Sequence, residues 1–295
     1  MLGIIIINYK SEKLTIEYVQ RELCKIIQPR IVVIVNNAAT EQTDALLCTA
    51  LDANRVKDIS IIPEQCNTGI YVISSDDNLG FAKGNNLGTK FLNQHFNIEY
   101  LLFSNNDIQI VDSDICERLI EKMEADPRIG IIGPKVVGLS GEYQSPEPYV
   151  SMTDHFCWMY LATPFMSTEQ KRKRFKLDYG KTAEEGFHYK VMGSFFLVRM
   201  ADYMACGMMD ESTFLYGEEV ILSERFRSIG KRIYYFPHVS VIHAHGVTTN
   251  KNLGKKGINK YSLASMMYYY HTYMHEPKWK CLLCKWIYLV VNLIK

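Results

Sequence analysis

Short apolar runs alternate with amphipathic segments through the first hundred residues, and this alternation limits the fold more than any other feature of the chain. Residues 4–7, 31–35 and 101–103 are continuous apolar runs, which are typical of strands buried on both faces of a sheet. The segment after Ser11 carries apolar residues at helical spacing. Strands that alternate with helices predict an α/β fold with a central, mostly parallel sheet.

Polar side chains follow each of these runs. Asn8 and Tyr9 follow the first run, Asn36 and Asn37 follow the second, and the sequence SNND at 104–107 follows the third. The carboxyl ends of parallel strands lie along one edge of an open sheet, and ligands bind at that edge. The sequence therefore predicts a ligand site there rather than a set of turns.

The second half of the chain continues the pattern. Asp112 or Ser113 is expected to cap a helix that ends near Met123, and Gly230 is expected to end a helix that starts at Glu218. Further strands are expected at residues 69–75, 129–137 and 193–200, with a strand, a turn and a second strand over 232–246.

We see no internal repeat and no flexible linker in the sequence. The simplest organisation is one domain over residues 1–250, made of halves at 1–110 and 111–250. A helical tail is expected over residues 251–295.

The composition supports a folded protein with a sizeable core. Of the 295 residues, 47% are hydrophobic and 22% are charged, which argues against disorder. The net charge of +1 argues against a general nucleic-acid binder. Eight scattered cysteines indicate reduced thiols in a cytoplasmic protein. Cys281 and Cys284 have the spacing of a redox or zinc pair, but we interpret them as core or interface thiols because no second pair stands beside them.

The last 18 residues combine apolar, aromatic and basic side chains. Residues 278–295 contain Trp279, Trp286 and four lysines around an apolar stretch. The stretch is too short to span a bilayer, and this mixture is typical of helices that lie in the membrane interface. We expect contact with the cytoplasmic face of the inner membrane; the alternative is a terminal helix packed on the body or on a second subunit of a homodimer.

Two motifs point to a bound phosphate compound. Asn105 and Asp107 form an N-x-D sequence, and magnesium often takes one or two carboxylates together with phosphate oxygens. The segment NLGFAKGNN at 78–86 supplies glycines that let the backbone approach a ligand and asparagines that can donate to it. Each signal is weak alone, because N-N-D turns are common and the glycines would also suit a helix start packed on a sheet.

Four carboxylates flank an aromatic loop that runs into a helix. They are Asp210, Glu211, Glu218 and Glu219. The helix dipole favours carboxylates at this position, which is sufficient to explain all four. Glu219, at the helix start opposite the strand ends, could also act as a general base.

Eight segments in this order resemble glycosyltransferase family 2, closest to the branch with bacterial rhamnosyltransferases and other cell-surface polysaccharide enzymes. The resemblance covers residues 3–246 and rests on IIIINYKS, VIVNNAAT, NLGFAKGNN, LLFSNND, IGIIGPKVV, MGSFFLVR, MMDESTFLYGEE and VSVIHAHG. It implies a glycosyltransferase-A fold and an inverting transfer from a UDP- or dTDP-linked sugar to a hydroxyl of a glycan or lipid-linked acceptor. It also implies Mg²⁺ or Mn²⁺ as cofactor.

The resemblance assigns roles by position. Asp107 would bind the metal with His243, and Glu219 would be the catalytic base. The donor would contact Asn105, the strand ends at Asn8, Tyr9, Asn36 and Asn37, and the turn at Asn78, Gly80, Gly84 and Asn86. The acceptor would contact Gly193, Asp210, Glu211 and Glu218.

The sequence departs from the family at three positions. Asn36 and Glu219 both stand where aspartate is usual, and Ile221 stands where an acidic residue is frequent. Carboxylates remain at Asp107 and Glu219, so we expect an active enzyme. His245 is interpreted as structural.

Two other readings stay open. A nucleotidyltransferase would also use an α/β sheet and a metal-bound carboxylate, but the chain lacks a glycine-rich, basic phosphate loop after its first strand. A catalytically inactive subunit that binds sugar nucleotides is the second alternative.

Overall fold

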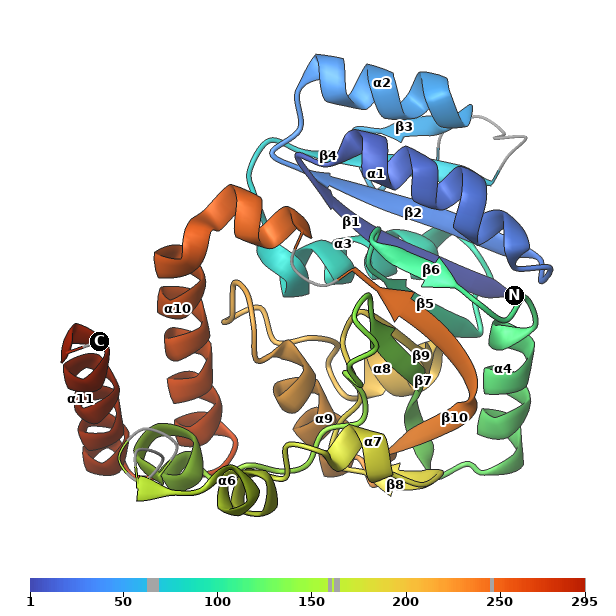
Figure 1. Cartoon of the computed structure of the whole chain (residues 1–295). Helices are drawn as coiled ribbons and strands as arrows, with labels where there is room; N and C mark the ends of the chain where they lie inside the picture. Colours follow the sequence, from blue (N-terminus) through green and yellow to red (C-terminus); the bar gives the residue numbers. More distant parts are fainter. Residues whose placement is uncertain (63–68, 159–160, 162–164, 245–246, 295) are drawn as a thin grey trace.

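The computed structural model describes residues 1–62, 69–158, 161, 165–244 and 247–294 and is built around one sheet (Figure 1). The sheet has ten strands, in the order β3-β4-β2-β1-β5-β9-β7-β10-β6, with β8 paired to β10. The strands are β1 Leu2–Tyr9, β2 Arg30–Asn37, β3 Asn54–Val56, β4 Ile70–Ser75, β5 Tyr100–Ser104, β6 Ile108–Ile110, β7 Ile129–Gly138, β8 Gly186–His188, β9 Phe195–Arg199 and β10 Arg232–His243.

The sheet is parallel in its first half and mixed in its second. Strands β3, β4, β2, β1 and β5 are parallel, β9 is antiparallel to both β5 and β7, and β10 is parallel to β7. The β1–β2 register pairs Asn8 with Asn36 and Tyr9 with Asn37, so these strand ends lie side by side. The predicted α/β fold class, with a mostly parallel sheet flanked by helices, is confirmed.

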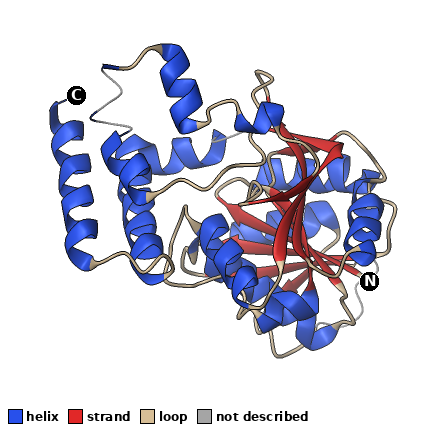
Figure 2. Cartoon of the chain, turned by 90° about the horizontal axis from the view of Figure 1, so that it is seen from below, coloured by secondary structure: helices blue, strands red, loops and turns tan. Residues whose placement is uncertain are grey.

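Helices cover both faces of the sheet (Figures 1 and 2). Ile4 and Ile6 of β1 point into one buried cluster and Ile5 into another, as the alternation of a strand requires. The helices are α1 Glu12–Glu17, α2 Glu41–Leu51, α3 Gly80–His95, α4 Ile115–Ala125, α6 Thr168–Phe175, α7 Tyr179–Thr182, α8 Met200–Ala205, α9 Glu218–Ser228, α10 Val247–Thr272 and α11 Lys278–Ile294, with shorter helical turns η1 Tyr18–Glu22, η2 Leu23–Lys25 and η3 Asp154–Trp158.

The C-terminal segment forms two helices that pack against the body. A third buried cluster joins α10 and α11 to η3 and to α9, through residues such as Tyr270, Cys284, Phe156 and Ile221. Cys281 and Cys284 are both buried there, as expected of core thiols. In the part of the chain that the structure describes, no helix is long and apolar enough to cross a membrane.

Several local expectations differ from the structure. Residues 232–243 form one strand instead of two, and its register shifts between Phe236 and Ser240. Pro237 stands within this shift, and because proline cannot donate to a ladder the strand bulges there. The helix expected from Asp112 begins at Ile115, because the Asp112 carboxylate accepts hydrogen bonds from Ser240 rather than from a helix N–H.

Candidate active site

A cavity of about 200 Å³ lies at the edge where the parallel strands end. Its wall includes residues from the ends of β1, β2, β5 and β10, from the start of α3 and from the loop before α9. The predicted site residues that line it are Tyr9, Asn37, Asn78, Gly80, Asn105, Asp107, Gly193, Glu218, Glu219 and His243. The edge that the sequence singled out therefore carries a cavity.

Asp107 and His243 face each other at the wall of this cavity. Asp107 Oδ1 is 3.3 Å from His243 Nε2, and both side chains are almost fully buried. The other ring nitrogen, Nδ1, is 2.7 Å from Oε1 of Gln144, whose own Nε2 donates to Glu142. The amide of Gln144 is thus oriented with its oxygen toward the ring, so Nδ1–H is the donor and Nε2 turns toward Asp107.

This arrangement fits a divalent cation. Asp107 Oδ1 is buried and accepts no hydrogen bond within the described chain. A buried carboxylate oxygen without a donor is costly, and a cation that it shares with an imidazole nitrogen would satisfy it. Among the described residues, no group of three His, Cys, Asp or Glu side chains could hold a metal. The described residues thus supply at most two such ligands, and the remaining positions suit phosphate oxygens and water.

Two neighbouring carboxylates enter the cavity from the first turn of α9. Glu218 is buried, and its Oε1 has no hydrogen-bond partner among the described residues. Burial, helped by the charge of Glu219, raises the pKa of Glu218 to about 8. Glu219 lies against Gly193, where a Cβ atom would come within 2.6 Å of its Oε1. Glycine at 193 is therefore what lets the Glu219 carboxylate approach the backbone before β9.

The ammonium group of Lys190 is buried near these carboxylates. Lys190 Nζ is 2.7 Å from Glu147 Oε1, and its side chain is largely buried. Burial alone would lower the pKa of Lys190, but the charges of Glu147 and Glu219 raise it above the ordinary value. Lys190 therefore stays charged and adds positive potential near Glu219.

Asn8 and Asn36 are buried behind the cavity instead of lining it. Asn8 Nδ2 donates to Asn36 Oδ1 at 2.7 Å, and Asn36 Nδ2 donates to Asp44 at 2.8 Å. Thr15 donates to Asn8 and accepts from Asn106 at 2.8 Å, which extends the network to the residue before Asp107. These contacts hold the ends of β1, β2 and β5 together.

The glycine-rich turn at the start of α3 serves packing as well as the cavity. Gly80 has a φ of +75°, and a Cβ there would lie 2.3 Å from the carbonyl oxygen of Phe214. Gly84 packs on Ile7 of β1 outside the cavity. Asn78 accepts from the N–H of Gly80, and Asn37 donates to its carbonyl oxygen. The turn is therefore held in shape by the residues that were expected to bind the donor.

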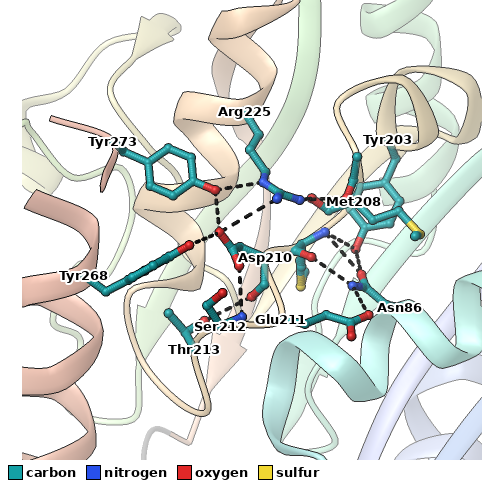
Figure 3. Close-up of polar contacts among 12 residues, drawn as sticks. Asn86, Tyr203, Met208, Asp210, Glu211, Ser212, Thr213, Arg225, Tyr268 and Tyr273 are labelled. Atoms are coloured by element: carbon teal, nitrogen blue, oxygen red, sulfur yellow. Dashed lines mark hydrogen bonds and ion pairs between the residues drawn. The ribbon is translucent and has the colours of Figure 1, made fainter. Parts of the chain in front are cut away.

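Asp210 belongs to a closed polar cluster (Figure 3) and does not line the cavity. Its Oδ2 accepts from Tyr268 at 2.8 Å and Tyr273 at 2.5 Å, while Oδ1 accepts from the N–H of Ser212. Arg225 lies 3.8 Å away and itself donates to Tyr273. The cluster ties α10 to α9 and to the loop before it.

Asn86 and Glu211 complete the same region. Asn86 Oδ1 accepts from Tyr203 and from the N–H of Met209, and its Nδ2 donates to Met209 and Glu211. All four hydrogen-bonding positions of the Asn86 amide are thus used within the chain (Figure 3). Neither residue lines the cavity.

The structure adds residues that the sequence did not single out. Gln144 fixes the His243 ring from a segment whose sequence has no regular pattern, so no local signal marks it. Ser11, Asn106, Met192, Ser194 and Tyr216 also line the cavity. Asn106 is the middle residue of the predicted N-x-D motif, so the sequence could have identified it. The positions of the other four at the cavity depend on tertiary contacts. His245 lies outside the described residues.

Comparison with known proteins identifies the class of fold. No protein-family model matches the chain. By structure, the chain is similar to the mannosyltransferase PcManGT from Pyrobaculum calidifontis in complex with GDP-Man and Mn²⁺, with a TM-score of 0.57 and 12% identity over 99% of this chain and 73% of that one. Residues 1–349 of S. aureus TarS give a TM-score of 0.51 at 14% identity, over 92% and 72% of the two chains. The fold is therefore that of the glycosyltransferase-A enzymes.

By sequence, the chain is similar to a curated transferase. Agl10 of Haloferax volcanii, a hexosyltransferase of low-salt glycan biosynthesis, is 24% identical over 245 residues. The match covers 82% of this chain and 66% of that protein, so the chain spans slightly less than two thirds of its relative. The chain thus combines a glycosyltransferase fold with sequence similarity to a hexosyltransferase.

Proposed function

We propose that the protein is a glycosyltransferase that moves a sugar from a nucleotide-diphospho-sugar to a hydroxyl group. The observation that carries this proposal is the buried Asp107 Oδ1 atom opposite His243, which has no hydrogen-bond donor among the described residues, in a cavity that also holds Glu219. A nucleotide diphosphate with a divalent cation would satisfy that oxygen. PcManGT, with GDP-Man and Mn²⁺, and GalNAc-T7, with UDP, GalNAc and Mn²⁺, support this choice of ligand.

We assign the nucleoside and the diphosphate of the donor to different parts of the cavity. Asn37 keeps a buried Oδ1 without a hydrogen bond within the described chain, beside Tyr9 at the ends of β1 and β2. These two residues suit the nucleoside. Asp107 and His243 would hold Mg²⁺ or Mn²⁺ with the diphosphate; when bound, the cation neutralises the charge of the leaving group.

Glu219 is the residue that we assign as the base. Its carboxylate lies at Gly193 inside the same cavity, where an acceptor hydroxyl would reach both it and the sugar. Glu219 accepts the hydroxyl proton as the acceptor oxygen forms its bond to the anomeric carbon and the bond to the diphosphate breaks. One displacement inverts the anomeric centre, as in the glycosyltransferase family 2 enzymes that the sequence resembles. Glu218, protonated at neutral pH, would donate a hydrogen bond to a sugar or acceptor oxygen.

We further propose that the donor is UDP- or dTDP-linked and that the acceptor is a glycan or a lipid-linked sugar of the cell surface. The apolar side chains of Phe81, Met192 and Leu215 line the cavity beside these carboxylates and suit the faces of sugar rings. An inactive binding subunit is the second reading, and the presence of Glu219 and Asp107 in one cavity favours the enzyme.

A donor screen tests the proposal. The purified protein would be incubated with UDP-, dTDP- and GDP-sugars, with and without Mn²⁺, and released nucleoside diphosphate would be measured beside Asp107→Ala. We expect metal-dependent release from one donor, lowered roughly 10²–10³-fold in the variant. If nucleotide raises the melting temperature but no donor is consumed, even with a mixture of glycan acceptors, the binding-subunit reading replaces the enzyme.

A further inference from the structure

Helix α11 carries an exposed apolar stripe along its outer side. Trp279, Leu282, Leu283, Trp286 and Leu289 are 67%, 66%, 48%, 63% and 45% exposed. These positions recur at three- and four-residue spacing, so they share one side of the helix. Such a contiguous set of large apolar side chains is unusual on the free surface of a soluble domain.

The opposite side of α11 fixes the direction in which the stripe points. Cys284 is buried with its Sγ 3.6 Å from Cys157, and the Tyr288 ring is 5.9 Å from Phe156 of η3. The helix therefore cannot turn to bury its stripe without losing this packing. Figures 1 and 2 both show α11 at the outer side of α10, away from the sheet.

A second exposed apolar set lies at and after η3, which itself packs on α11. Trp158, Leu161 and Phe165 are 47%, 51% and 89% exposed. The chain has three tryptophans, and all three are exposed, one at the end of η3 and two on α11. We call Trp158, Leu161, Phe165 and the outer side of α11 the tryptophan face. Tryptophan is enriched where proteins meet the interface between lipid headgroups and acyl chains.

Positive charge borders the tryptophan face. Residues 278–294 contain no acidic residue, and Lys278 and Lys285, both exposed, stand seven residues apart on one margin of the stripe. Helix α6 adds the sequence KRKR at 171–174, and the Arg174 guanidinium lies 5.9 Å from the Trp158 ring centre. The face is therefore apolar in the middle and basic at its edge.

We propose that the tryptophan face docks on a bilayer that contains anionic lipids. Its apolar side chains would enter the boundary below the headgroups, and its lysines and arginines would contact the lipid phosphates. A second copy of the chain is a poorer occupant, because a two-fold contact across α11 would bring lysines against lysines with no acidic residue of the helix to pair them. This inference does not depend on the transferase activity.

Vesicle binding followed by tryptophan fluorescence tests the proposal directly, because every tryptophan reports on the proposed contact. The full chain would be titrated with vesicles of 30% phosphatidylglycerol and 70% phosphatidylcholine, and with pure phosphatidylcholine. We expect a blue shift and cosedimentation with the anionic vesicles and much weaker binding to the neutral ones. Lys278→Gln with Lys285→Gln should weaken binding roughly 5-fold for each lysine.

Trp279→Ser with Trp286→Ser should abolish cosedimentation while circular dichroism stays unchanged, because both side chains are exposed. The matched control is Ile27→Ser, which removes an apolar side chain that is 72% exposed before β2. Equal binding of the wild type and the double tryptophan variant would overturn the proposal. The proposal would also be overturned if the protein did not bind vesicles and light scattering showed a dimer of the wild type that is absent in the double tryptophan variant.

Discussion

Asp107 and Asp210 are both carboxylates with little exposure to solvent, but their oxygens have different surroundings. The Oδ1 atom of Asp107 faces the cavity with no hydrogen-bond donor among the described residues, whereas Asp210 accepts from two tyrosines and a backbone N–H beside Arg225. Complete hydrogen bonding makes a cluster a structural element, while an unsatisfied buried oxygen needs a ligand. The contrast separates residues that hold the fold from residues available to bind.

The largest expected effect comes from Glu219, the proposed base. Glu219→Gln keeps the size of the side chain but cannot accept a proton, so we expect kcat to fall roughly 10²–10⁴-fold. The melting temperature should change little. Transfer would be measured with the donor found in the screen, with Glu117→Gln on the exposed side of α4 as the control. If Glu219→Gln keeps most of its activity, the base is another group in the cavity.

The next effect concerns the residue that orients His243. Gln144→Leu removes the acceptor of the Nδ1 proton and leaves the imidazole free to choose its other tautomer. We expect the Mn²⁺ concentration for half-maximal activity to rise roughly 10–100-fold, with kcat at saturating metal much less affected. A metal titration separates the two parameters. His243→Gln should raise the Mn²⁺ concentration for half-maximal activity more than Gln144→Leu does. The reverse order would show that Gln144 acts without the histidine.

The sequence predicted the sheet, its buried strands and the ligand edge, because those follow from apolar runs and from polar residues at strand ends. The sequence was less informative about which polar side chains line the cavity. Asn8 and Asn37 both end parallel strands, yet Asn8 turns to Asn36 and Thr15 while Asn37 lines the cavity. Side-chain direction at a strand end depends on the neighbouring helix, which local sequence does not specify.

The acidic loop shows the same limit. Asp210, Glu211, Glu218 and Glu219 are close in sequence, but only the last two line the cavity. Asp210 meets Tyr268 and Tyr273 of the C-terminal segment, which are about sixty residues away along the chain. Such long-range contacts cannot be read from spacing, and the expected boundary near residue 250 gave no indication of them.

A substitution at Asp210 tests whether its hydrogen-bonded cluster stabilises the fold. Asp210→Asn removes the charge beside Arg225 and weakens two tyrosine hydrogen bonds, so we expect the free energy of unfolding to fall by about 2 kcal/mol. Burial would raise the pKa of Asp210, but the hydrogen bonds from Tyr273, Ser212 and Tyr268 lower it overall. Its contribution is therefore present at neutral pH and lost as the pH falls through the lowered value. Urea unfolding of the wild type and the variant at pH 7 and pH 3 measures the loss of stability and its dependence on pH.

Glu117→Gln again provides the control for loss of a carboxylate. The resemblance to family 2 enzymes instead predicts that Asp210 contacts the acceptor. Unchanged stability together with a raised acceptor KM in Asp210→Asn would favour that role over the structural one.

The last effect concerns Glu218, which lines the cavity and whose Oε1 has no hydrogen-bond partner among the described residues. Burial and the charge of Glu219 raise its pKa to about 8, so the folded protein binds this proton more tightly than the unfolded chain does. The stability that Glu218 contributes is therefore complete at acidic pH and declines as the pH rises toward 8. Glu218→Gln removes that decline. We therefore expect its free energy of unfolding at pH 8.5 to exceed that of the wild type by on the order of 2 kcal/mol. The difference should shrink toward pH 5; a constant difference across this range would show that Glu218 does not carry the raised pKa.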